Sequence, residues 1–239
     1  MTMHGRERHH VVQRVHSLCR RWVPLGVLRL CVSTLLSAAS SRAEEAVSSA
    51  CGHLIAVGGG PGGAGTACFS CHGLQGQGDA GGAFPRLAGL DAPSFARQMK
   101  DYVPGARSNA VMTPIVQQLS PADRQSVALY YAGLSVQEPQ LASAAAADAS
   151  LIQRGATLYA QGSAERGIQA GTHCHGPGGL SCVDPSIADQ PRSYVETQLR
   201  LWQEGVRRND IAELMGSAAR RMTDEDIRAV LADVAGLPP

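Results

Sequence analysis

The residues with the most distinctive chemistry are two cysteines and a histidine in the pentapeptide CFSCH, residues 68–72. Two thiols three residues apart can add to the two vinyl groups of a haem, and an adjacent imidazole can then bind the iron from one face. The C-x-x-C-H spacing of Cys68, Cys71 and His72 is typical of c-type haem attachment. The sequence therefore predicts that these three residues hold a haem c.

Two other chemistries fit a C-x-x-C pair. A redox dithiol is typical of a β-α-β context, which the glycine-rich approach at 58–65 does not supply. A zinc site needs two further ligands, and four later residues satisfy that count: Cys174, His175, His173 and Cys182. A methionine favours haem over zinc, because Met is the common sixth ligand of haem iron in electron carriers. Met112 lies 40 residues after His72 and is the predicted sixth ligand.

The motif recurs in altered form later in the chain. A shift of 103 residues superposes three pairs of residues: Cys71 on Cys174, His72 on His175, and Met112 on Met215. The interval from histidine to methionine is again 40 residues. The first cysteine is missing, because Gly171 stands where Cys68 would be and the second motif is GTHCH. A repeat of this kind indicates two copies of one domain, with Cys174 attached to a second haem and His175 and Met215 as its iron ligands.

The segments around the motif repeat as well. RQMKDYVPGARSN (97–109) matches TQLRLWQEGVRRN (197–209), and LSPADRQSVALYYAGL (119–134) matches MTDEDIRAVLADVAGL (222–237). We expect domain 1 over 44–134, a low-complexity linker over 135–149 and domain 2 over 150–239. Arg107 and Arg207 also match, and each is assigned either to a haem propionate or to the solvated surface.

The N-terminus has the pattern of an export signal. Five arginines precede residue 22, an apolar stretch over 22–39 follows, and SRA precedes Glu44. The alternative is a retained membrane anchor, since Arg29 interrupts the apolar stretch. If residues 1–43 are a signal peptide, the remaining chain has a net charge of −5 and is periplasmic. No basic face for nucleic acid is expected, and an acidic carrier favours partners with a basic docking patch.

The coarse pattern predicts an all-α fold without strands. Helices are expected near 44–57, 68–72, 93–102 and 120–131, with their counterparts in the second copy, and residues 103–118 around Met112 are expected to be irregular. Ser120 with Asp123, and Thr223 with Asp226, predict the starts of the final helix of each copy.

These motifs together resemble the periplasmic dihaem cytochromes of the c-four type, which have two tandem class I cytochrome c domains. The likeness covers roughly 55–134 and 150–237 and is carried by CFSCHGLQGQG, FPRLAGL, HCHGPGG and the two methionines. It implies small all-α haem domains and a proline carbonyl that accepts a hydrogen bond from the ligating histidine, at Pro85 and Pro185. It also implies an electron carrier, not an enzyme, that docks briefly with redox proteins and associates with a membrane oxidase or a dehydrogenase.

The second site leaves three states open because of Gly171. The haem is held by the Cys174 thioether alone, is bound without a covalent link, or is absent. A dihaem carrier is the leading hypothesis. The alternatives are a one-haem carrier whose second domain serves for docking, and the cytochrome subunit of a periplasmic dehydrogenase. Pairing between Cys51 and Cys182 is left open.

Overall fold

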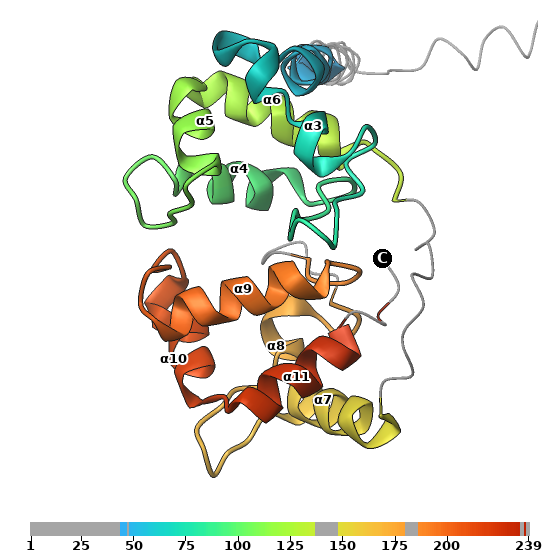
Figure 1. Ribbon diagram of the computed structural model, residues 1–239, viewed down its shortest axis with the longest axis vertical. Helices are drawn as coiled ribbons and strands as arrows, with labels where there is room; N and C mark the ends of the chain where they lie inside the picture. The colour runs from blue at the N-terminus through green and yellow to red at the C-terminus, as the bar shows by residue number, and fades with distance from the viewer. Residues whose placement is uncertain (1–43, 47, 137–147, 180–185, 235–236, 238–239) are drawn as a thin grey trace, which may run out of the picture. The chain divides into compact units, whose positions relative to one another are not determined.

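The computed structural model describes residues 44–46, 48–136, 148–179, 186–234 and 237. The chain divides into two compact units, Met1–Glu45 and Ala46–Pro239, and the second unit contains both copies of the repeat. The proposed signal peptide lies wholly outside the described residues, as does most of the proposed linker. In the part that is described, every regular element is an α-helix or a short 3-10 helix, and the only extended pairs are two isolated bridges. The all-α prediction is confirmed (Figure 1).

The N-terminal copy builds its core from four α-helices and the helical residues 48–58. The elements follow in this order: η1 (Gly60–Gly62), η2 (Ala64–Thr66), α3 (Phe69–His72), α4 (Ala92–Lys100), α5 (Met112–Gln118) and α6 (Pro121–Ala132). The glycine-rich segment that cannot continue a helix becomes the two 3-10 turns. Helix α4 packs against α6, with the fully buried Val127 and Tyr131 in the core between the elements.

The C-terminal copy repeats this plan. Its elements are α7 (Ala149–Gln161), α8 (Thr172–His175), α9 (Arg192–Gln203), η3 (Ile211–Glu213), α10 (Leu214–Arg221) and α11 (Asp224–Val234). Helix α11 packs mainly against α7, and α10 packs against α9. Among all the residues that the structure describes, no helix is long and apolar enough to cross a membrane.

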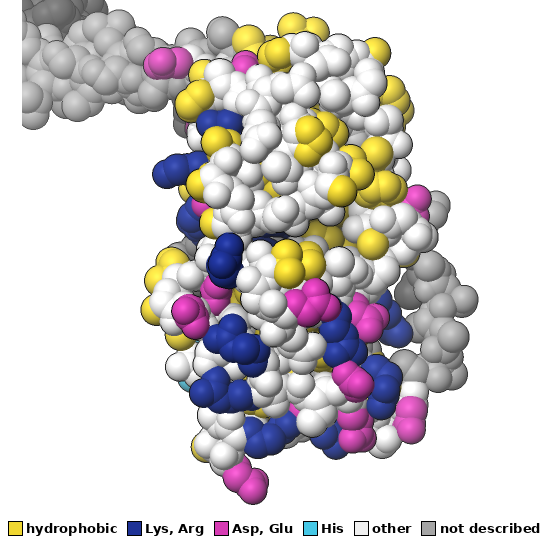
Figure 2. Space-filling model, turned by 60° about the vertical axis from the view of Figure 1, so that its left-hand side comes forward, with side chains coloured by type: hydrophobic (Ala, Val, Ile, Leu, Met, Phe, Trp, Pro, Cys, Tyr) yellow, Lys and Arg dark blue, Asp and Glu magenta, His cyan; other side chains and the backbone are white. Residues whose placement is uncertain are grey.

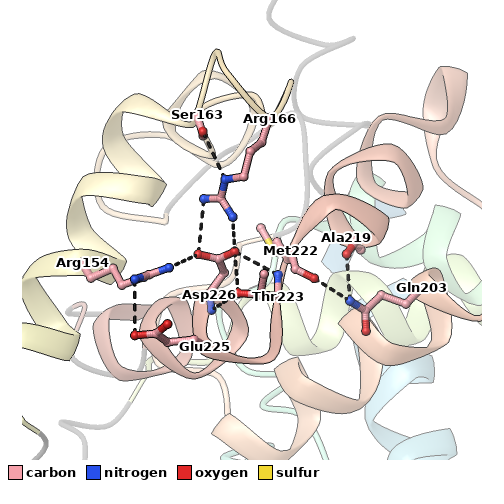
Figure 3. A network of polar contacts seen from close by, with 9 residues as sticks. All are labelled: Arg154, Ser163, Arg166, Gln203, Ala219, Met222, Thr223, Glu225 and Asp226. Carbon is pink, nitrogen blue, oxygen red and sulfur yellow. Dashed lines mark hydrogen bonds and ion pairs between the residues drawn. The ribbon is translucent and has the colours of Figure 1, made fainter.

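Both predicted caps are present. The Ser120 hydroxyl accepts a hydrogen bond from the Asp123 amide, and the Asp123 carboxylate accepts one from the Ser120 amide. Thr223 and Asp226 make the same reciprocal pair at the start of α11 (Figure 3). Each reciprocal pair, known as a capping box, satisfies two backbone amides that have no hydrogen-bond partner inside the helix.

A glycine lies at a close contact between two helices in each copy. A Cβ on Gly52 would lie 2.0 Å from the carbonyl oxygen of Ser126, and a Cβ on Gly155 would lie 2.0 Å from that of Ala229. The two glycines are 103 residues apart, as are their two neighbours. Only glycine permits this separation, so the repeat extends to the backbone contact that docks the first helix of each copy on its last.

The segment around Met112 corrects the prediction for 103–118. Met112 begins helix α5, and the Asn109 side-chain oxygen accepts hydrogen bonds from the amides of Val111 and Met112, both at 2.9 Å. The Asn109 side chain therefore satisfies two amides at the start of α5, as a capping residue would. An asparagine three positions ahead of Met112 is a local signal for a helix start that the sequence contained. The methionine stands on a defined helical turn and not on irregular backbone.

The two copies differ sharply in charge. Residues 46–136 contain nine Asp, Glu, Lys and Arg, whereas residues 148–237 contain twenty-one. In Figure 2 acidic and basic side chains crowd the C-terminal copy, while the N-terminal copy presents mainly apolar and uncharged groups. Exposed apolar side chains of the N-terminal copy include Leu54, Phe69, Leu74 and Val111.

Candidate haem sites

The attachment motif forms one tight helical turn. Cys68 precedes α3, and the amide of His72 donates to the Cys68 carbonyl at 3.0 Å, which places both cysteines and the histidine on the same helical turn. Gly73 ends the turn with a φ of 81°, a conformation that favours glycine. Both cysteines are half-buried free thiols.

The His72 ring is oriented by the chain. Its Nδ1 lies 2.9 Å from the carbonyl oxygen of Pro85. A carbonyl only accepts, so Nδ1 carries the proton and Nε2 keeps its lone pair. Nε2 is buried and has no hydrogen-bond partner, and burial lowers the pKa of His72, which favours the neutral ring. An oriented, neutral imidazole with a buried unpartnered nitrogen is the arrangement that a metal ligand requires.

A single cavity of about 590 Å³ connects these residues with their counterparts. Its lining is mostly apolar. It includes six of the seven predicted site residues: Cys68, Cys71, His72, Met112, His175 and Met215. An apolar cavity with convergent nitrogen and sulfur donors suits a porphyrin with a soft axial ligand. The residues present therefore fit haem in the N-terminal copy.

The C-terminal copy keeps the ligand positions but changes the attachment. His175 is buried, Met215 is half-buried on α10, and both line the cavity. Cys174 is half-buried and is not among the cavity-lining residues, whereas Gly171 is. Pro185, the predicted acceptor for the histidine ring, lies outside the described residues. The second site thus has the two candidate ligands in place and a single candidate sulfur.

Arg107 and Arg207 are buried, which overturns the solvated-surface alternative. They are 7% and 5% exposed. The Arg107 guanidinium lies over the Tyr102 ring at 4.8 Å, and that of Arg207 lies over the Trp202 ring at 3.9 Å. Burial, and then the charge of Arg107, lowers the pKa of Arg207 to about 10. Nε of Arg107 has no partner. Burying two like charges beside the cavity is unfavourable unless an anion balances them.

The polar residues that hold this arginine pair were not identified from the sequence. Arg207 donates to the side-chain oxygens of Gln198 at 2.7 Å and Gln98 at 2.8 Å. Arg107 donates to Gln98 at 3.2 Å and to the Tyr194 hydroxyl at 2.9 Å. The two glutamines occupy matching places in RQMKDY and TQLRLW, so the repeat contained the signal.

The remaining candidates have simpler outcomes. The zinc alternative finds no support in the described segments, where no group of three or more His, Cys, Asp or Glu is placed to hold a metal ion. His173 is exposed. Cys51 is an exposed free thiol, and Cys182 lies outside the described residues, so their pairing is not tested.

Known proteins of two descriptions are similar to the chain over most of its length. The chain is 36% identical to a thiosulfate dehydrogenase electron acceptor of Stutzerimonas stutzeri, over 83% of this chain and 89% of that protein. It is 37% identical to the protein of the same description in Thiomonas intermedia, over 72% and 78%. It is also 33% identical to cytochrome c4 of Pseudomonas aeruginosa, over 71% and 83%. No protein-family model matches the chain.

Solved structures that are similar to the chain include a thiosulfate dehydrogenase and cytochrome c4. The thiosulfate dehydrogenase TsdBA of Marichromatium purpuratum matches with a TM-score of 0.69 and 35% identity, and the match covers 80% of this chain. The chain spans only 40% of that longer protein. Reduced cytochrome c4 of Pseudomonas stutzeri matches with a TM-score of 0.66 and 27% identity, over 79% of this chain and 97% of that one.

Proposed function

Because the chain belongs to the cytochrome c4 family of dihaem class I cytochromes, we propose that it accepts electrons from a thiosulfate dehydrogenase and passes them on through two haems c. Membership makes the chain an electron carrier that binds haem c and works with redox partners. The donor is the finer part of the proposal. Its main support is the pair of thiosulfate dehydrogenase electron acceptors that match at 36% and 37% identity.

In the N-terminal site, we assign His72 Nε2 and the Met112 sulfur as the groups that would bind the haem iron, and the Cys68 and Cys71 sulfurs as those that would form the thioethers. Haem c, when bound, supplies an iron that takes up and releases one electron. The Pro85 carbonyl fixes the imidazole and strengthens its donor character through the hydrogen bond at 2.9 Å. The Met112 sulfur would favour Fe(II) and so raise the potential. With both residues bound, the iron would have no position left for a substrate, which suits an electron carrier.

In the C-terminal site, we assign His175 and Met215 as ligands and Cys174 as a thioether donor. Both ligands line the same continuous cavity as His72 and Met112. A shared cavity supports electron transfer between the two sites within one chain. The buried cations of Arg107 and Arg207 lie beside it, and haem propionates are the anions that would balance them.

The proposal includes the compartment and the domain boundaries. Cytochromes of this family are periplasmic, and residues 1–43 have the composition of an export signal. We assign 44–134 and 150–239 as the two haem domains, joined by a linker over 135–149. Association with a membrane oxidase is part of the proposal at the accepting end.

The test mixes the oxidised holoprotein with thiosulfate and catalytic amounts of a thiosulfate dehydrogenase under anaerobic conditions. The growth of the reduced α-band is followed by stopped flow. Reduction that depends on both the enzyme and thiosulfate is expected. If the cytochrome stays oxidised while the same enzyme reduces ferricyanide, the proposed donor is wrong.

A further inference from the structure

The missing cysteine has left the backbone of the second attachment turn unchanged. In α3 the amide of His72 donates to the Cys68 carbonyl at 3.0 Å, and in α8 the amide of His175 donates to the Gly171 carbonyl at 2.8 Å. Cys68 has φ −60° and ψ −38°, and Gly171 has φ −62° and ψ −32°. The two turns therefore share one backbone conformation, although Cys71 lines the cavity and Cys174, which is half-buried, does not.

Gly171 is explained by space and not by conformation. Its φ is one that any residue adopts. A Cβ at this position would lie 2.5 Å from both Cδ2 and Cε2 of Tyr159, far inside contact distance. The place that the side chain of Cys68 occupies in the first copy is filled by an aromatic ring in the second.

Tyr159 is held firmly in that place. Its hydroxyl donates to the carbonyl of Gly176 at 2.7 Å, the residue is 6% exposed, and its ring lines the cavity. The shift of 103 residues pairs Tyr159 with Ala56, which is 1% exposed. The small residue of the first copy accompanies a cysteine, and the large residue of the second accompanies a glycine. The two exchanges run in opposite directions, and the Tyr159 ring takes the space that a cysteine side chain at position 171 would need, so the second pocket is packed for a single sulfur.

We propose that the second haem is attached by one thioether, from Cys174, and that Tyr159 packs where the first thioether would form. This inference rests on the proposed haem in the second site. In the linkage, the Cys174 sulfur bonds to one vinyl carbon and its proton moves to the other, with no net gain or loss of electrons. The second vinyl group would stay unreacted, because residue 171 has no thiol.

The first test locates the haem on the chain without using any redox partner, so its result is independent of the proposed donor. The full chain is produced with a haem-attachment system, digested and fragmented by mass spectrometry. We expect one haem on the peptide with Cys68 and Cys71 and one on Cys174. In Cys174→Ala, haem on the second peptide should be lost, whereas Cys182→Ala should retain it. Wild-type protein whose second haem is absent, is extracted by acidic acetone, or is attached to Cys182 would overturn the proposal.

The second test addresses Tyr159. Gly171→Cys alone should yield little second thioether, because the ring blocks the new side chain. Gly171→Cys with Tyr159→Ala should form it, moving the pyridine haemochrome α-band of the second haem to that of a two-thioether haem. The single variant Tyr159→Ala should leave the band unchanged. If Gly171→Cys alone forms the second thioether as fully as the double variant, Tyr159 does not exclude it and the proposal fails.

Discussion

Among the helix-capping residues of the C-terminal domain, Asp226 is the one whose replacement should lower the free energy of unfolding most. Its carboxylate is fully buried and accepts hydrogen bonds from Arg154 at 2.9 Å and from the Thr223 amide and hydroxyl, both at 2.9 Å. Arg166 donates to both of its oxygens (Figure 3). Asp226→Asn removes the charge, turns one acceptor into a donor and leaves the Arg166 guanidinium without a carboxylate, whereas Arg154 keeps its ion pair with Glu225 at 3.3 Å.

The magnitude follows from the exposure of the partners. Breaking a buried ion pair costs about 3–5 kcal/mol when the remaining charge stays buried. Here the side chains of Arg154 and Arg166 are 43% and 36% exposed, so water can solvate them after the change. The Asn oxygen also retains one bond to Thr223. The free energy of unfolding should therefore fall by about 2–3 kcal/mol.

Asp123→Asn is the matched control. Asp123 makes the same capping pair with Ser120 in the N-terminal copy, and it has no arginine partner among the described ion pairs. Its replacement should cost about 1 kcal/mol or less. The assay is urea unfolding of each oxidised holoprotein, followed by far-UV circular dichroism. Equal losses in the two variants would refute the argument, because the ion network would then contribute nothing.

The pH dependence supplies a second check on Asp226. Burial raises the pKa of this carboxyl, but hydrogen bonds from Arg166, Thr223 and Arg154 outweigh burial and hold the folded-state pKa well below its usual range. The stabilisation is therefore complete above the unfolded pKa, near 3.8, and is lost as the pH falls below it. The difference between wild type and Asp226→Asn should be constant above about pH 5 and shrink below about pH 4. A difference that persists unchanged at pH 3 would contradict the assignment.

Three further predictions concern the haem sites and the helix contact. Met112→Ala should open one coordination position, so that the reduced protein binds carbon monoxide and the midpoint potential falls; wild type with the same affinity would contradict the assigned ligand. Arg207→Gln should lower a midpoint potential by an amount on the order of tens of millivolts, measured by redox titration, because a nearby buried cation favours Fe(II); an unchanged potential would remove it from the haem environment. Gly155→Ala should destabilise the C-terminal domain by about 1–3 kcal/mol in urea, because the new Cβ meets the Ala229 carbonyl, and no loss would mean that the helices separate freely.

Local signals in the sequence predicted much of this molecule. Cys68, Cys71 and His72 are adjacent on one turn, and a cap such as Ser120 acts within three residues, so neither needs knowledge of the fold. The repeat then transferred these assignments to the second copy, down to His175 and Met215. The helix at Met112 was missed, although Asn109 is a local signal of the same kind.

Tertiary contacts explain what the sequence did not reveal. Arg107 and Arg207 are buried because ring faces and glutamine oxygens from elsewhere in the fold surround them, and no local pattern distinguishes such an arginine from a solvated one. A cysteine is excluded at position 171 by the side chain of Tyr159, which lies twelve residues earlier on another helix. Only the structure places the two residues side by side.

The measurement that most directly tests the central claim is an anaerobic titration of the oxidised protein with thiosulfate in the presence of a thiosulfate dehydrogenase. The electrons taken up per chain are counted from the haem absorbance. A dihaem electron acceptor should take up two electrons per chain, one at each site. Uptake of one electron would contradict the two-haem assignment, and uptake of none, with an enzyme that reduces ferricyanide, would contradict the donor.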